Sequence, residues 1–202
     1  MIRIGITGGI GSGKSTVCRM LEERGVPIYD SDANARRLMN TDAELRSELV
    51  GAFGEDTYSS EGLNRAYLAS VVFSDAESLK RLDEIVHPAV RRDFREWCAR
   101  HSAEDYVVLE SAILFDAGFE TEVDRTLAVV APADLRIERV CSRDGMSRED
   151  VERRIANQMS DDELQSRADY TIANIMLDYL RSDVEQLDKI FRYESRRNDI
   201  RS

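Results

Sequence analysis

A glycine-rich segment near the start of the chain has the residue types and the spacing that bind phosphate. It reads Gly8-Gly9-Ile10-Gly11-Ser12-Gly13-Lys14-Ser15 and fits the pattern G-x-x-x-x-G-K-[ST]. Because glycine has no Cβ, backbone N–H groups can point at phosphate oxygens, and a helix that begins there adds unpaired N–H groups and a favourable dipole. We expect the phosphate-binding residues to be Gly8, Gly9, Gly11, Ser12, Gly13, Lys14, Ser15 and Thr16.

Two side chains at the end of this loop suit phosphoryl transfer. Lys14 can reach the β- and γ-phosphates of a nucleoside triphosphate, and Ser15 can place its hydroxyl on Mg²⁺. The alternative is a glycine-rich turn that holds a lysine by chance. A predicted strand before the loop and a predicted helix after it favour the phosphate-binding interpretation. The sequence therefore predicts a triphosphate site with Mg²⁺ as the cofactor.

Acidic residues at predicted strand ends are candidates for the remaining chemistry. Asp30 and Asp32 follow the second predicted strand, and Glu110 ends the third. In an open α/β sheet the carboxyl ends of the strands face the ligand, so a carboxylate there could accept a proton from a substrate hydroxyl or hold a water on Mg²⁺. Spacing alone leaves two alternatives open, which are Asp30 or Ser31 as a helix cap and Glu110 as an exposed strand-end acid.

A histidine and a group of arginines allow both structural and functional interpretations. His87 precedes Pro88, which predicts a helix boundary there, and the residues alone favour a structural role for this histidine. The arginines between positions 136 and 167 alternate with acids, which is typical of a solvated, ion-paired surface. An enzyme that transfers a phosphoryl group nevertheless needs cations over the triphosphate, so an arginine-bearing lid is the alternative.

The order of apolar segments predicts the elements that position these residues. Continuous apolar runs predict short strands at 2–6, 26–29, 106–109, 126–130 and 170–173. Amphipathic patterns predict helices at 14–24, 133–143, 147–158 and 176–193. Buried strands that alternate with helices indicate an α/β fold with a parallel sheet covered on both faces.

The long stretch from 33 to 100 does not fit a simple connection between two strands. Its pattern is mostly helical, with capping boxes predicted at Thr41–Glu44 and Ser74–Glu77. Gly51, Gly54 and Gly62 are expected to break these helices. The sequence therefore predicts a helical insertion built onto the α/β core.

Charge and composition exclude several classes of protein. The 202 residues carry 28 Lys and Arg against 39 Asp and Glu, and the net charge of −11 disfavours binding to nucleic acids and to anionic membranes. No apolar run approaches the roughly 18 residues of a transmembrane helix. Cys18, Cys98 and Cys141 stand far apart without a CxxC pair, which indicates reduced thiols. We expect a cytoplasmic protein with no nucleic-acid or membrane partner, and the sequence leaves its oligomeric state open.

Further motifs extend the pattern along nearly the whole chain. They are Tyr29-Asp30-Ser31-Asp32-Ala33 with Ala35-Arg36, Leu82 with Ile85-Val86-His87-Pro88, Leu114-Phe115, Arg139 with Arg143-Asp144, Arg154-Ile155 with Gln158, and Ala168-Asp169-Tyr170 with Ile172 and Asn174. With these motifs the chain resembles the bacterial dephospho-CoA kinases, the last enzymes of coenzyme A synthesis. The D-x-D and H-P segments, at these distances from the glycine-rich loop, make the resemblance specific.

The resemblance implies a fold, a division of the chain and a reaction. The fold would be a P-loop kinase core with a five-stranded parallel sheet flanked by helices. The core would comprise residues 1–30, 101–135 and 168–202, with a helical CoA-binding insertion at 31–100 and a lid at 136–167. The reaction would move the γ-phosphoryl group of ATP to the ribose 3′-hydroxyl of dephospho-CoA, so that these two small molecules are the implied partners.

The resemblance also implies roles for single residues. Asp32 would be the general base and would act in catalysis together with Lys14 and Arg143. Arg139 and Asn174 would join the glycine-rich loop in binding ATP. The acceptor would contact Asp32, Arg36, His87 and Glu110, and Ser15 would hold Mg²⁺.

The sequence departs from the family pattern at a few positions. Ala112 and Asp116 stand where the family usually has the Pro and the Glu of P-L-L-F-E. Arg136 replaces a common Gln, Ala173 replaces a common Asp, and the glycine usually found after Asn174 is missing. These changes affect the turn after the third strand and the loop on the adenine side, and they leave the glycine-rich loop and the D-x-D segment intact.

Two other functions remain open from the sequence. A kinase for nucleosides or nucleoside monophosphates would share the glycine-rich loop and the lid, but the D-x-D and H-P segments argue against it. A nucleotide-sensing module that hydrolyses ATP slowly or not at all is the alternative from a different class. The chain has no Asn-Lys-x-Asp segment of the kind that recognises guanine, and this absence argues against a GTPase.

Overall fold

The computed structural model describes residues 1–72 and 75–199 and divides into two compact units. Unit 1 comprises Met1–Tyr29 and His101–Ser202, and unit 2 comprises Asp30–Arg100. Within the described ranges, no helix combines the length and the apolar character that crossing a lipid bilayer requires.

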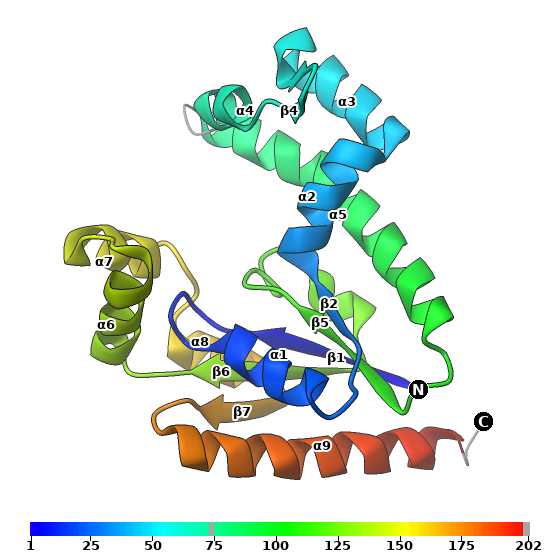
Figure 1. Ribbon diagram of the computed structural model, residues 1–202, viewed down its shortest axis with the longest axis vertical. Coiled ribbons are helices and arrows are strands. Elements are labelled where there is room, and N and C mark those ends of the chain that lie inside the picture. Colours follow the sequence, from blue (N-terminus) through cyan, green and yellow to red (C-terminus); the bar gives the residue numbers. More distant parts are fainter. Residues whose placement is uncertain (73–74, 200–202) are drawn as a thin grey trace. The chain divides into compact units, whose positions relative to one another are not determined.

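Unit 1 is built on the predicted parallel sheet, which is confirmed. Its five strands are β1 (Ile2–Thr7), β2 (Ile28–Asp30), β5 (Tyr106–Glu110), β6 (Arg125–Val130) and β7 (Tyr170–Ala173), in the order β2-β5-β1-β6-β7 (Figure 1). The central strand β1 pairs in parallel with β5 and β6, and Ile4 lies opposite Val108 in the register. The glycine-rich loop follows β1 directly, so it leaves the sheet at the carboxyl ends of the central strands.

Two helices cover one face of this sheet. They are α1 (Lys14–Glu22) and α9 (Leu177–Asp199), which runs along the sheet in Figure 1. Val17 and Leu21 of α1 and Val184 of α9 are buried in one apolar cluster with Ile4 of β1. This packing fixes the first turn of α1, and with it Lys14 and Ser15, against the core.

The other face is covered by the segment that follows β5. A Cβ added to Gly5 of β1 would lie only 2.9 Å from Leu114 of this segment and 3.0 Å from Val123. The segment ends in the short 3-10 helix η2 (Phe119–Glu122), with Phe119 buried. The sheet is therefore buried on both faces, which explains the continuous buried runs of the inner strands β5 and β6.

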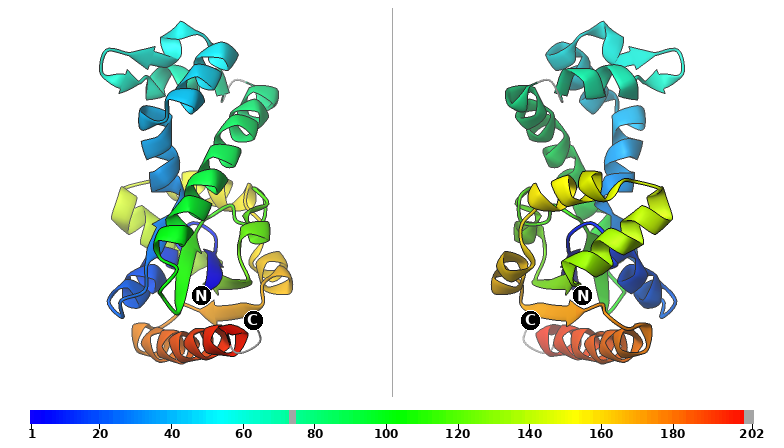
Figure 2. Two further views of the ribbon diagram at one scale, coloured as in Figure 1. Left: turned by 90° about the vertical axis from the view of Figure 1, so that its right-hand side faces the viewer. Right: turned by 90° about the vertical axis from the view of Figure 1, so that its left-hand side faces the viewer.

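Three shorter helices occupy the region predicted as a lid. They are α6 (Ala133–Asp144), α7 (Arg148–Ala156) and α8 (Asp161–Arg167), and Figure 2 shows α6 and α7 as a helical hairpin. The sequence analysis missed α8, because Leu164 is the only apolar residue among its seven, so the helix carries no apolar period. Its start is marked instead by a capping box between Ser160 and Glu163.

Unit 2 is helical, with one small hairpin that the sequence analysis missed. Its helices are α2 (Ser31–Thr41), α3 (Ala43–Phe53), α4 (Arg65–Val72) and α5 (Ala76–Arg100). The 3-10 helix η1 (Glu55–Thr57) and the two-residue strands β3 (Tyr58–Ser59) and β4 (Gly62–Leu63) connect α3 to α4 (Figure 2). The long helix α5 packs against α2, α3 and α4, so it is the axis of this unit.

The predicted helix limits in unit 2 need two corrections. Asp42, not Thr41, caps α3, and its carboxylate accepts a hydrogen bond of 3.0 Å from the N–H of Leu45. Gly51 does not break a helix but lies inside α3, which ends at Gly54 as predicted. The prediction at Ser74 falls outside the described residues, and Asp75 next to it accepts the N–H of Ser78 at 2.9 Å.

The predicted helix boundary at Pro88 is also wrong. Both His87 and Pro88 lie inside the 25 residues of α5. Proline has no N–H to donate to the preceding turn, which costs about 3 kcal/mol in a helix interior. Val90 and Phe94 of the same helix are each about 1% exposed, and burying such side chains contributes about 1.5–3 kcal/mol each, which offsets this cost.

Candidate active site

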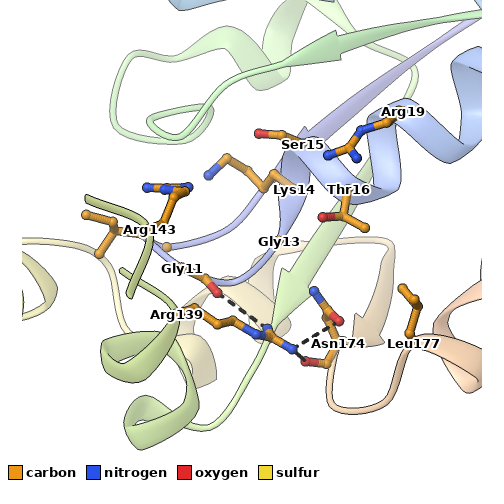
Figure 3. A pocket seen from close by; sticks show the side chains of 12 residues that line it. Gly11, Gly13, Lys14, Ser15, Thr16, Arg19, Arg139, Arg143, Asn174 and Leu177 are labelled. Carbon is orange, nitrogen blue, oxygen red and sulfur yellow. Dashed lines mark hydrogen bonds between the residues drawn. The ribbon is translucent and has the colours of Figure 1, made fainter. Parts of the chain in front are cut away.

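A cavity of about 430 Å³ opens over the glycine-rich loop of unit 1 (Figure 3). It is lined by Gly9, Ile10, Gly11, Gly13, Lys14, Ser15, Thr16, Arg19, Arg139, Arg143, Asn174 and Leu177. The lining brings together the first turn of α1, two arginines of α6 and the loop between β7 and α9. Cationic side chains and a helix N-terminus meet in this cavity, which suits a polyanionic ligand.

The loop reaches its shape through glycine and through contacts with its neighbours. Gly13 precedes α1 with a φ of 96°, in the left-handed region, and a Cβ there would overlap the side-chain amide of Asn174. That amide donates a hydrogen bond of 2.8 Å to the carbonyl of Ser12, whose side chain is fully buried behind the cavity. Lys14 opens α1, and its Nζ donates to the carbonyl of Gly8 at 2.7 Å.

Two of the predicted lid arginines lie at the cavity. Arg139 donates to the carbonyls of Asn174, at 3.0 Å, and of Gly11, at 3.4 Å, as drawn in Figure 3. Arg143 donates through Nε and one terminal nitrogen to the two carboxylate oxygens of Asp144, both at 2.7 Å. These hydrogen bonds lower the pKa of Asp144 and raise that of Arg143. Both guanidinium groups are therefore held at the cavity by hydrogen bonds.

Ser15 and Glu110 form a small group of oxygen atoms beside Lys14. The Ser15 hydroxyl donates to Oε1 of Glu110 at 3.2 Å, which joins the start of α1 to the end of β5. Mg²⁺ prefers such oxygen ligands, and in kinases it uses one or two protein groups together with substrate phosphates and water. Among residues 1–72 and 75–199 no cluster of three or more acidic, histidine or cysteine side chains could hold a metal without such help. The pair fits Mg²⁺ that arrives with a nucleotide.

The D-x-D segment divides its two carboxylates between different roles. Asp30 is the N-cap of α2, and its side chain accepts the N–H of Ala33 at 2.8 Å, so for this residue the capping alternative is correct. Asp32 lies in the first turn of α2 and is exposed. Arg36 follows four residues later, and residues with this spacing share one face of a helix. In unit 2, α2 thus presents the carboxylate of Asp32 and the guanidinium group of Arg36 on one face.

His87 lies in the middle of α5, next to an acid of the preceding turn. Its Nε2 is 3.6 Å from Oδ1 of Asp83, and 19% of its side chain is exposed. Burial lowers the pKa of His87 below its ordinary value of 6.5, the Asp83 carboxylate raises it, and the Arg91 cation lowers it again. The imidazole is therefore predominantly neutral at pH 7 and can donate or accept one hydrogen bond at each nitrogen.

The sequence analysis missed two residues that line the cavity and one that lies beside its glycine-rich loop. Arg19 and Leu177 line it, and the only sequence signal for Arg19 is its place one helical turn after Ser15. Arg136 was expected on a solvated surface, but it is only 3% exposed and contacts the glycine-rich loop. Its burial follows from Gly9 and Gly11, because a Cβ on either of them would overlap this arginine.

The predicted site residues are thus distributed over both units. In unit 1 one cavity unites most of the glycine-rich loop with Arg139, Arg143 and Asn174, and Glu110 joins it through Ser15. Gly8 and Ser12 belong to the same loop but not to the lining. The acceptor-side candidates Asp32, Arg36 and His87 lie on α2 and α5 of unit 2.

Comparisons with known proteins agree with this geometry. The family model for dephospho-CoA kinase matches residues 2–177. The dephospho-CoA kinase of Bacteroides fragilis is 43% identical over 173 residues, which cover 86% of this chain and 84% of the relative. That of Salinibacter ruber is 45% identical over 177 residues, which cover 86% and 89%.

Solved structures show the same relationship. The crystal structure of TT1252 from Thermus thermophilus superposes with a TM-score of 0.81 at 41% identity and covers 96% of this chain and 97% of that one. A shikimate kinase from Acinetobacter baumannii shares only the fold, with a TM-score of 0.54 at 18% identity over 96% and 94% of the two chains. The match of the family model to most of the chain and the close relatives lead to one conclusion: this chain belongs to the dephospho-CoA kinase family.

Proposed function

We propose that this chain transfers the γ-phosphoryl group of ATP to the ribose 3′-hydroxyl of dephospho-CoA, which gives CoA and ADP. The observation that carries the proposal is the cavity of unit 1, where Lys14, Arg139 and Arg143 gather around a helix N-terminus. Membership in the dephospho-CoA kinase family supports the choice of acceptor. ATP and dephospho-CoA are then the two substrates, and no nucleic acid or membrane takes part.

The chemical step requires alignment and charge neutralisation more than covalent chemistry by the protein. The acceptor oxygen forms a bond to the γ-phosphorus while the bond from that phosphorus to the β,γ-bridging oxygen breaks. The hydroxyl proton passes to the carboxylate of Asp32, and ADP leaves. Lys14 and Arg143 neutralise the charge that develops on the phosphoryl oxygens, and backbone N–H groups at the start of α1 hold the β-phosphate.

Ser15 and Glu110 would hold Mg²⁺ in this site. The hydrogen bond between their side chains supports the metal-side role for Glu110 over direct contact with the acceptor. Mg²⁺ held by these two residues would supply positive charge that offsets the charge of the phosphate oxygens. The ATP-side residues are then Arg139 and Asn174 together with the loop from Gly8 to Thr16.

The acceptor side of the reaction is assigned to unit 2. Asp32 would accept the proton, Arg36 would attract the phosphate groups of dephospho-CoA, and His87 would donate a hydrogen bond to it. An exposed carboxylate with a cation four residues further along α2 supports this assignment. On this proposal residues 31–100 bind the acceptor and residues 136–167 close over ATP as a lid.

The cysteines support a reducing compartment. Cys18, Cys98 and Cys141 are present as thiols, and Cys18 and Cys98 are buried. Proteins with such thiols and no disulfides are typical of the cytoplasm. We therefore keep the cytoplasm as the proposed location.

A single assay tests the proposed function. ADP release from ATP and Mg²⁺ is measured with dephospho-CoA, AMP, adenosine, shikimate or no acceptor, and with EDTA as a further control. We expect release with dephospho-CoA alone, formation of CoA, and loss of activity with EDTA. Release with another acceptor would overturn the assignment of the substrate. Bound nucleotide without any acceptor-dependent release would favour the nucleotide-sensing alternative.

A further inference from the structure

Ile10, in the middle of the glycine-rich loop, is held by the α6–α8 region through three separate contacts. Its N–H donates to Oε1 of Gln158 at 2.8 Å, and its carbonyl accepts from Nε of Arg136 at 2.9 Å. Its side chain packs against a small apolar core that includes Ile137 and Val151. Both peptide groups and the side chain of one loop residue are therefore fixed by a segment that lies more than a hundred residues later in the chain.

Arg136 is placed to bind the carbonyl of Ile10 rather than to contact a ligand in the cavity. Its side chain is 4% exposed, it pairs with Asp161 at 2.8 Å, and it does not belong to the lining of the cavity. Its second terminal nitrogen lies beneath Gly9 and has no hydrogen-bond partner among the residues that the structure describes. Burying a cation is costly unless it is paired and hydrogen-bonded, so this arginine is held at the back of the loop by Asp161 and by Ile10.

We propose that Arg136 and Gln158 are positioning residues that prepare the glycine-rich loop for a nucleotide. They fix the two peptide groups of Ile10, and through them the direction in which the N–H groups of the loop point. A loop that is already ordered loses less conformational freedom when the ligand binds, which tightens binding without any new contact. The segment 136–167 is then the rear support of the nucleotide site in addition to its proposed role as a lid.

This inference depends on the proposed function only for the choice of ATP as the ligand. It concerns binding of the nucleotide, and it makes no use of the acceptor or of the chemical step. Loss of the support is expected to weaken ATP binding and to raise the KM for ATP. The KM for the acceptor is expected to stay unchanged, because Arg136 and Gln158 both contact the nucleotide loop.

Two substitutions of Arg136 separate its hydrogen bond from its bulk. In Arg136→Gln the side-chain nitrogen stands at the same number of bonds from Cα as the arginine Nε, so it can still donate to the carbonyl of Ile10. Arg136→Met has the same length without a donor, and both variants lose the ion pair with Asp161. Arg148→Met is the matched control, because it removes an exposed arginine of the same region that pairs with Asp134 and Glu152.

Binding of ATP with Mg²⁺ is measured by calorimetry in the absence of any acceptor, and the melting temperature of each variant is recorded. We expect the Kd for ATP to rise about tenfold in Arg136→Met, which corresponds to about 1.4 kcal/mol. The Kd values of Arg136→Gln and Arg148→Met are expected to stay within about threefold of that of the unaltered chain, because the first keeps a donor to the Ile10 carbonyl and the second removes pairs with Asp134 and Glu152 only. A merely structural role for Arg136 predicts that its variants change the melting temperature and leave the Kd for ATP unaltered. Equal Kd values for Arg136→Gln and Arg136→Met would therefore overturn the proposal.

A second pair of variants decides the question if Arg136→Met does not fold. Gln158→Met keeps the length of the side chain and removes the acceptor for the Ile10 N–H, and Gln165→Met is its control on the exposed side of α8. We expect a weaker Kd for ATP in the first and no change in the second. An unchanged Kd in Gln158→Met would overturn the proposal.

The two proposals fail in different ways. If the unaltered chain binds ATP but does not phosphorylate dephospho-CoA, the proposed function fails and the comparison of Kd values still decides the role of Arg136 and Gln158. If the unaltered chain does not bind ATP at all, both proposals are overturned.

Discussion

The glycine-rich loop of unit 1 and the helices of unit 2 carry their candidate residues in different ways. In the loop the backbone itself is the proposed binding group, and Gly9, Gly11 and Gly13 each lie so close to a neighbour that a Cβ would overlap it. In unit 2 the candidates are side chains on regular helices, and Gly51 of α3 has no atom within 4 Å of where a Cβ would lie. A site made of backbone tolerates few substitutions, whereas a site made of helix side chains leaves its scaffold free to change.

The largest effect is expected for Lys14→Ala in the loop. Removing a cation that neutralises transition-state charge costs on the order of 10³-fold in kcat. Because Lys14 is only partly buried, we expect the melting temperature to stay nearly unchanged. Steady-state kinetics and thermal unfolding measure both quantities.

Lys189→Ala is the matched control for this variant, since Lys189 is an exposed lysine of unit 1 that pairs with Glu185. A fall in melting temperature together with activity in Lys14→Ala, but not in the control, would show that the lysine supports the loop rather than the reaction.

The next effect is expected for Asp32→Asn on α2 of unit 2. A general base contributes at least on the order of 10²-fold, so we expect kcat to fall by this factor with nearly unchanged KM values. Asp56→Asn, at an exposed acid of η1, is the control. If kcat survives and only the KM for the acceptor rises, Asp32 positions the acceptor and does not take its proton.

A smaller effect is expected when the pH is changed through the range in which His87 titrates, and the quantity affected is the free energy of unfolding. Its pKa is below 6.5 in the folded chain because of burial, so under mildly acidic conditions the unfolded chain binds more protons. The free energy of unfolding therefore falls as pH is lowered through 6.5. Burial raises the pKa of Asp83 above 3.8, which gives the opposite slope just above that value.

Urea unfolding between about pH 7.5 and pH 5.5 measures the contribution of His87, within the range where histidine titrates. We expect His87→Gln to flatten the slope more than His101→Gln, which removes the other histidine of the chain. Parallel slopes in the two variants would contradict the assignment to the buried imidazole.

The smallest effect is expected for Gly51→Ala in α3. The position is exposed, lies inside the helix and has open space around it, so alanine should stabilise unit 2 by about 0.5–1 kcal/mol. Gly25→Ala is the control, because Gly25 also has open space but a φ of 81°, where a side chain is strained. Urea unfolding should give opposite signs for the two variants.

The fold could be predicted from sequence wherever one pattern dominates locally. Residues 106–109 of β5 form a continuous buried apolar run, and short apolar segments of this kind predicted all five strands of the sheet. The prediction failed where tertiary packing outweighs a local rule. Pro88 is inside a helix because the apolar face of α5 is buried, and α8 forms from a capping box without an apolar period.

The candidate site also contains residues that could be predicted from the sequence and residues that could not. The glycine-rich loop is contiguous, so its spacing alone predicts its chemistry, and its placement at the end of β1 follows from the strand before it. Arg136 and Gln158 could not be predicted, because they contact Ile10 across 126 and 148 positions of the chain. Single polar residues at such separations carry no periodic signal that would relate them to a loop.

Trp97 lies on α5 of unit 2, where its ring stacks on Phe94 at a centroid distance of 6.1 Å. The sequence holds one tryptophan, so the intrinsic tryptophan fluorescence of the chain comes from unit 2. Quenching or a spectral shift on addition of dephospho-CoA would therefore be an optical record of events at the helical unit, obtained without attaching a dye to the protein.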